Sequence, residues 1–298
     1  MPAGQTRQHH HLMPFFAVAA GIATFSIMDG LMKAASLAVG AYNAMLWRSL
    51  VGALIMVPFW LLRGGKWPER PALKLHAARG LTSAFMATTF FYGLKYLPLA
   101  EGMAISFIAP LIALYLAAVM LGETIGRRAI FASLLGLAGV VVIAAARLGQ
   151  GGYDRQAAWG IAAILASAVL YAFNLILQKR QAGLAAPIEV AAFQALTTSL
   201  FLLIVSPWLA VAPPLGVMGH VTGAALLAAV SLMLISWGYG RAETQVLLPL
   251  EYSAFIWAAI MGWVMFGETL SLPTVAGAAL IVIGCWIAAR KHIEATAV

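Results

Sequence analysis

Ionisable side chains lie within the long apolar stretches of this sequence, where a charge is costly. Moving an arginine, lysine or aspartate to the centre of a membrane helix costs about 2.5–3.5 kcal/mol on insertion scales. Each such residue therefore needs a partner or a water-filled cavity. Side chains of both signs in one place could bind a ligand that carries both a carboxylate and an amine. The residues of this kind are Asp29, Arg48, Arg79, Lys95, Glu101 and Glu251.

Two pairs among these residues suggest how a cavity could be closed. Asp29 and Arg48 lie at similar depth in the outer halves of the first two apolar stretches, so they could form an ion pair. Asp29 could instead pair with Lys33, four residues further along the same helix. Arg79 and Glu251 lie at similar depth near the opposite side. We expect one pair to close each side of a cavity, and the alternative is that both arginines reach to the nearest interface.

Prolines and aromatic residues add further candidates for the cavity wall. Pro249 removes a backbone donor and so frees a carbonyl close to Glu251. Pro110 should likewise free a carbonyl in the corresponding segment of the first half. In this setting Glu251 could bind protons or cationic groups, or it could be a packed glutamate that holds helices together. We predict a cavity lined by aromatic side chains: Tyr92, Phe107, Tyr171, Tyr252 and Trp257.

The sequence offers little for catalysis or for a bound cofactor. It contains one cysteine, Cys285, so no disulfide or cysteine-based metal site can form within the chain. There is no His-Glu-x-x-His motif and no glycine-rich phosphate loop. We therefore expect no catalytic residue, no metal and no cofactor, and no use of ATP by this chain. An intramembrane enzyme and a non-transporting scaffold remain the alternatives of another class.

The elements that position these residues are long apolar helices. The chain is 63% hydrophobic and 9% charged, whereas soluble domains carry about 25% charged residues. Ten apolar runs are near the length of about 20 residues that spans a bilayer, and no alternation of a β-barrel is seen. The sequence predicts an all-α polytopic membrane protein with ten transmembrane helices at 14–36, 42–62, 74–95, 100–121, 128–146, 157–178, 188–208, 219–239, 245–266 and 272–290.

Basic residues set the expected orientation in the membrane. With a cytoplasmic N-terminus, and with Arg48 and Arg79 left out because they lie well inside helices, twelve of the lysines and arginines fall on the inner side and four on the outer side. This asymmetry predicts both termini in the cytoplasm and a multi-pass protein of the cell inner membrane. The net charge of +8 is explained in this way, without a nucleic-acid partner.

Two nearly identical heptapeptides reveal an internal repeat. "VMLGETI" occupies 119–125 and "VMFGETL" occupies 264–270, and at the same shift of 145 positions Asp29 corresponds to Asn174. Helices 1–5 therefore resemble helices 6–10, and because five is odd the second copy starts from the opposite side of the membrane. Inverted repeats around a central cavity are typical of secondary transporters. The alternative is an ancient duplication retained only for packing.

The repeat suggests domain limits and some purely structural roles. We assign one five-helix repeat to 14–146 and the other to 157–290, with cytoplasmic tails at 1–13 and 291–298. The glycine before Glu123 and before Glu268 suits a helix end, and each glutamate should cap or pair with the following turn rather than bind substrate. Glycine-containing segments such as 136–139 and 277–279 should let helices approach closely.

Two longer segments resemble a known family. "FYGLKYLPLAEGMAISFIAPLIALYLAAVMLGE" (91–123) and "PLEYSAFIWAAIMGWVMFGE" (249–268) are similar to the first-half and second-half signatures of the EamA-type transporters, in the drug/metabolite transporter superfamily. The resemblance implies a ten-helix basket with a central cavity. One departure from the pattern is Phe255, which stands where a proline corresponding to Pro110 is often found.

The resemblance also implies a class of function. Members export amino acids and other metabolites or import vitamins or S-adenosylmethionine, so we expect a small-molecule substrate, most simply amino acids moved outward by alternating access. The alternative is import of a vitamin or nucleoside-like metabolite such as riboflavin or S-adenosylmethionine. Membrane lipids are the expected surroundings. Coupling to protons, and the choice between a monomer and a homodimer, stay open at this point.

Overall fold

The computed structural model describes residues 5–109, 111–113, 115–116, 127–149, 155–239, 241, 250 and 253–295. Within these ranges the chain is all-helical, without a β-strand. Each predicted run contains one helix, and the all-α prediction is confirmed. The helices are α1 (Gln5–Val39), α2 (Ala41–Leu62), α3 (Arg70–Gly93), α4 (Leu99–Ser106), α6 (Arg127–Gly149), α7 (Arg155–Ala182), α8 (Pro187–Leu209), α9 (Leu215–Tyr239), α11 (Ser253–Phe266) and α12 (Leu272–Ala295).

Helix α4 ends within the predicted run 100–121, and the described residues 109, 111–113 and 115–116 that follow are helical again. It ends at Ser106, where the N–H of Phe107 donates to the carbonyls of both Met103 and Ala104 and the chain turns. Pro110 lies outside the described residues, but a proline has no N–H to offer the carbonyl of Ser106 four residues earlier, so the sequence disfavours an uninterrupted helix here. A helix broken in the middle of a membrane protein is tolerated where its backbone faces a cavity or other protein.

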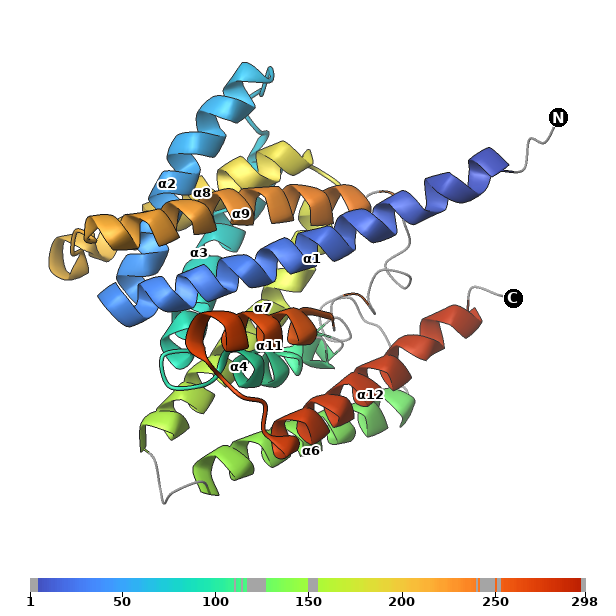
Figure 1. Cartoon of the computed structure of the whole chain (residues 1–298). Coiled ribbons are helices and arrows are strands. Elements are labelled where there is room, and N and C mark those ends of the chain that lie inside the picture. The colour runs from blue at the N-terminus through green and yellow to red at the C-terminus, as the bar shows by residue number, and fades with distance from the viewer. Residues whose placement is uncertain are drawn as a thin grey trace.

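The helices pair across the two halves in a way that the repeat explains. The first half supplies α1, α2, α3, α4 and α6, and the second supplies α7, α8, α9, α11 and α12. Helix α1 packs against α9, and α3 packs against α7. Exchanging the halves converts the first of these pairs into the second. The pairs α2 with α8, α4 with α11 and α6 with α12 convert into themselves. The predicted architecture of two inverted five-helix repeats is confirmed, and Figure 1 shows the α1–α9 and α6–α12 pairs lying side by side.

Glycines allow the closest of these helix contacts. A Cβ added at Gly139 of α6 would lie 2.5 Å from the carbonyl oxygen of Gly277 in α12, and one added at Gly277 would lie 2.7 Å from that of Gly139. Gly93 and Gly160 make a similar mutual contact between α3 and α7. The expected close approach of helices at small residues is therefore present at residues 139 and 277.

The outer surface suits a lipid environment. Large apolar side chains are strongly exposed around the molecule, among them Leu54 at 74%, Trp208 at 77% and Leu272 at 82%. Such a surface is not that of a soluble monomer. Five helices are long and apolar enough to cross a membrane by themselves, at Met13–Val39, Ala41–Leu62, Arg155–Gln178, Pro187–Leu209 and Leu215–Gly238. Helix α3 is not among them, because its inner face carries buried His76 and Arg79.

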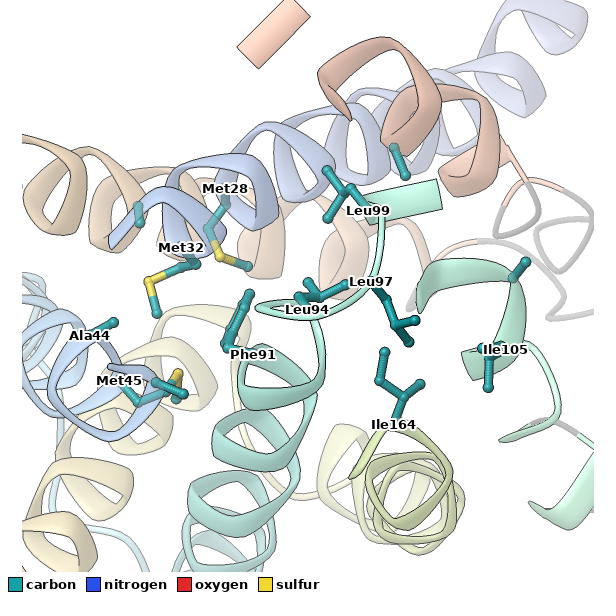
Figure 2. Packing of buried hydrophobic residues seen from close by; sticks show 14 of the residues in the cluster. Met28, Met32, Ala44, Met45, Phe91, Leu94, Leu97, Leu99, Ile105 and Ile164 are labelled. Carbon is teal, nitrogen blue, oxygen red and sulfur yellow. The ribbon is translucent and has the colours of Figure 1, made fainter. Parts of the chain in front are cut away.

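The apolar core lies just beyond the middle of α1. Met32 and Met45 are completely buried, and Phe91 of α3 is 2% exposed beside them. Figure 2 shows this packing, which includes Leu97 of the α3–α4 connection and Leu99 at the start of α4. Densely packed methionines and leucines leave no room for solvent there. This core therefore bounds the cavity described next.

Candidate binding cavity

A cavity of about 280 Å³ lies between the two halves of the molecule. Four helices supply most of its wall: α1 between Val18 and Asp29, α3 between Arg79 and Phe91, α7 between Ser167 and Gln178, and α9 between Ala228 and Ile235. These are the two helix pairs that the repeat exchanges, α1 with α9 and α3 with α7. Its size is near the lower end for small-molecule sites.

Asp29 and Arg48 both line this cavity, but they do not pair directly. Asp29 is 2% exposed, and its Oδ2 atom has no hydrogen-bond partner within the described part of the chain. Arg48 reaches only the sulfur of Met28, at 3.8 Å from Nη1, and its Nε atom is also without a partner there. Both residues line the cavity, and no hydrogen bond or ion pair joins them. The predicted ion pair is thus not formed in this structure.

Lys33 pairs with a residue of the other half, not with Asp29. Its Nζ atom forms an ion pair with Glu268 and donates to the carbonyl of Leu97 at 2.8 Å. The second oxygen of Glu268 accepts the N–H of Leu99 at 2.7 Å. Both partners of the Glu268 side chain come from the first repeat, so the predicted cap or pairing with its own following turn is wrong.

The glycine of the second Gly-Glu-Thr segment ends α11 as predicted. Gly267 has φ +65°, a left-handed conformation that favours glycine, and its N–H donates to the carbonyl of Trp263. This sharp end directs Glu268 back toward α4. The first Gly-Glu-Thr segment, with Glu123, lies outside the described residues.

Arg79 is held by neutral side chains. It is 3% exposed, its Nε donates to Asn174 Oδ1 at 3.0 Å, and its Nη1 donates to Gln181 Oε1. Asn174 in turn donates to Ser83 Oγ at 2.8 Å. An arginine fixed by amides keeps its full positive charge available to an anion in the cavity. The predicted partner Glu251 lies outside the described residues, so that pairing remains a prediction.

The aromatic candidates fall into three groups. Phe107 and Tyr171 line the cavity. Tyr92 and Trp257 lie on the outer surface, 41% and 37% exposed, and Tyr92 packs against Tyr96. The structure therefore places these two away from the cavity, because their helices turn them outward. Tyr252 lies outside the described residues, as do Pro110 and Pro249.

Sequence reasoning did not select several polar residues that the structure gathers near Arg79. On α3 they are His76 and Ser83, and on α7 they are Asn174, Gln178 and Gln181. Their spacing could have found them, since His76, Arg79 and Ser83 are three and four residues apart and the α7 set is four and three apart. Such spacing places side chains on one helix face, and here that polar face is the one turned inward.

Known proteins share both this architecture and this sequence pattern. The model of the EamA-like transporter family matches residues 12–145 and 158–290, which is one match in each half. The chain belongs to the EamA-like transporter family. It is therefore a multi-pass membrane transporter of a small molecule, and its central cavity lies between the two EamA-like repeats.

Individual relatives of this EamA-like transporter carry different substrates. The pseudopaline exporter CntI of Pseudomonas aeruginosa is 22% identical over 88% of this chain and 90% of its own length. The S-adenosylmethionine uptake transporter of Rickettsia prowazekii is 21% identical over 88% of this chain and 87% of its own. A solved crystal structure aligns with a TM-score of 0.65 at 23% identity, covering 93% of this chain and 98% of that one, and shows the same fold.

Proposed function

We propose that this chain is a secondary transporter that exports amino acids or similar zwitterionic metabolites by alternating access. The observation that carries the proposal is a pair of charged atoms in one cavity, Asp29 Oδ2 and Arg48 Nε, that have no hydrogen-bond partner among the described residues. A buried polar group without a partner costs about 1–3 kcal/mol, and more when it is charged. A ligand with an amine and a carboxylate would satisfy both atoms at once.

Arg79 strengthens this proposal from the opposite wall. It offers a second cation for a carboxylate, so the cavity presents one acidic and two basic side chains among its described residues. Phe107 and Tyr171 would face the remaining, less polar part of the substrate. The substrate chemistry that fits is a small molecule with a carboxylate, an amine and an apolar or aromatic portion.

The orientation and the moving units form part of the proposal. The basic residues favour an inner membrane location with both termini in the cytoplasm, and Figure 1 shows the N- and C-terminal ends extending to the same side of the molecule. Residues 14–146 and 157–290 would be the units that rock against each other. Because the α1 wall of the cavity stops at Asp29 and Lys33 pairs with Glu268 beyond it, this structure would correspond to the state closed toward the outside.

Direction and substrate are supported by relatives only at the level of analogy. The pseudopaline exporter favours outward transport. The S-adenosylmethionine uptake transporter favours the second candidate, import of a nucleoside-like metabolite, because S-adenosylmethionine also carries an amine and a carboxylate. Asp29 would then face a substrate with additional positive charge.

Flux into proteoliposomes tests the proposal. The purified full-length chain would be reconstituted and offered a panel of radiolabelled amino acids, riboflavin and S-adenosylmethionine, with and without an imposed pH gradient. We expect saturable flux of at least one amino acid whose KM rises about ten-fold or more in Asp29→Asn and in Arg48→Gln. Flux of riboflavin alone, which has no carboxylate, would overturn the zwitterion assignment. Unchanged flux when the pH gradient is collapsed would rule out proton coupling.

A further inference from the structure

A buried chain of polar side chains leads away from the cavity through α3, α7 and α8. Arg79 Nη1 donates to Gln181 Oε1. Gln181 Nε2 lies 2.6 Å from His76 Nδ1, and His76 Nε2 lies 3.0 Å from Glu189 Oε1. Gln181 and His76 are each 1% exposed, whereas the Glu189 side chain is 17% exposed. The chain therefore links the cavity arginine to a carboxylate at the surface.

The direction of every hydrogen bond in this chain follows from Arg79. A guanidinium can only donate, so the Gln181 atom that faces it must be the amide oxygen. The amide NH₂ of Gln181 then faces His76 Nδ1, which must accept. The imidazole proton is consequently on Nε2, where it donates to the carboxylate of Glu189. All donors and acceptors are satisfied only when His76 is neutral and in this tautomer.

A second proton on His76 would break this arrangement. It would sit on Nδ1 and face the NH₂ group of Gln181, which places two donors against each other. Turning the Gln181 amide by 180° would restore an acceptor for His76 but would then oppose NH₂ to the guanidinium of Arg79. Gln181 can thus serve His76 or Arg79, but not both, once His76 carries two protons.

We propose that His76 and Gln181 are positioning residues for Arg79, and that a proton on His76 releases Arg79 from Gln181. The released guanidinium keeps its bond to Asn174 and gains freedom at Nη1. This inference rests on the proposed function in one respect, since Arg79 is taken there as a carboxylate ligand. Occupation of the cavity and protonation of His76 are thereby linked.

Few charged groups in the described part of the chain lie close enough to His76 to affect its protonation. The charged groups that act on it are Glu189 of α8 and Arg79 of its own helix. Helix α7 presents the neutral Gln181, and Phe193 of α8 stacks on the imidazole ring with centroids 4.5 Å apart. The Glu189 carboxylate at Nε2 is therefore the group that would stabilise a doubly protonated His76.

Nitrogen-15 NMR of the full-length chain in nanodiscs tests the relay without any substrate. Histidine and arginine would be labelled in separate samples, with His76 assigned through His76→Gln and Arg79 through Arg79→Lys. At about pH 8 we expect His76 to be protonated only on Nε2. On acidification to about pH 5, the imidazolium signal of His76 and a shift of the Arg79 side-chain signal should share one midpoint.

Two matched glutamine variants sharpen the test. In Gln181→Glu the carboxylate can accept from Arg79 and from a doubly protonated His76 together, so the Arg79 signal should no longer move when His76 takes its proton. In Gln194→Glu, the same change at a cavity residue outside the relay, the shared midpoint should persist. Both variants must elute as monodisperse protein. In the wild type, the tautomer of neutral His76 shows by itself whether the hydrogen-bond directions inferred above are correct.

The outcomes separate the relay from the transport proposal. Two results would overturn the relay. One is a neutral His76 with its proton on Nδ1, and the other is an Arg79 side-chain signal that does not shift when His76 becomes doubly protonated. If the coupled shift is found and the proteoliposome panel gives no amino-acid flux, the relay stands and the proposed substrate falls. If amino acids are carried and the coupled shift is absent, the transport proposal stands and the relay falls.

Discussion

Lys33 and Glu268 join the first half of the chain to the second, 235 residues apart in sequence, one helical turn beyond Asp29. The backbone of the α3–α4 connection completes the contact, because Lys33 also donates to the carbonyl of Leu97 and Glu268 also accepts the N–H of Leu99. The ion pair is therefore part of a fixed arrangement of donors and acceptors. It lies where the cavity ends and the apolar core begins.

Reversing a single charge of this ion pair should strongly destabilise the protein. Lys33→Glu places a second carboxylate against Glu268 in a buried position, and breaking such pairs typically costs about 3–5 kcal/mol. Exchanging both residues, Lys33→Glu with Glu268→Lys, should recover only part of the loss. Thermal unfolding in detergent measures both. Full recovery in the double variant would show that the backbone contacts of Leu97 and Leu99 contribute nothing.

Neutralising Asp29 should weaken transport while leaving the fold intact. Asp29→Asn keeps the shape of the side chain and removes a buried, unsatisfied charge, so the melting temperature should not fall. The lost interaction with a substrate amine is worth about 1.5–3 kcal/mol, equivalent to about ten- to one-hundred-fold in KM. Initial rates of amino-acid uptake measure the change. Ser206→Ala, on α8 and outside the cavity lining, is the control and should stay within about two-fold of the wild type.

The α6–α12 contact should tolerate no side chain at Gly139. A Cβ there would meet the backbone of Gly277, which cannot move aside as a flexible side chain can, so Gly139→Ala should cost about 1–3 kcal/mol through overpacking. Gly219→Ala is the matched control, since a Cβ at that helical position meets nothing within 4 Å. Equal melting temperatures for the two variants would contradict the close packing of these helices.

The corresponding loops of the two repeats should face opposite sides of the membrane. Lys66 lies between α2 and α3, and Ala212 lies between α8 and α9, and both are exposed. With Cys285 replaced by serine, Lys66→Cys should react with an impermeant maleimide only from the cytoplasmic side, and Ala212→Cys only from the outside. Labelling with the sides exchanged would reverse the orientation inferred from the basic residues.

Much of this protein follows from its sequence alone, because helix length, hydropathy and repetition are local properties. The ten apolar runs, the inverted repeat and the helix stop at Gly267 needed no tertiary information. The repeat aligned Asp29 with Asn174 in the sequence, but it was the structure that placed both residues in the cavity wall.

Partners across the cavity were decided only by the tertiary structure. The sequence predicted that Asp29 pairs with Arg48 or with Lys33. In the structure Lys33 pairs with Glu268 instead, and no ion pair joins Asp29 to Arg48. Periodicity in the sequence shows which side of a helix is polar. The distance between polar faces on two different helices depends on how the five helices of one repeat pack against the five helices of the other. For the same reason Tyr92 and Trp257 turned out to lie on the surface, and His76 turned out to reach Arg79 through Gln181.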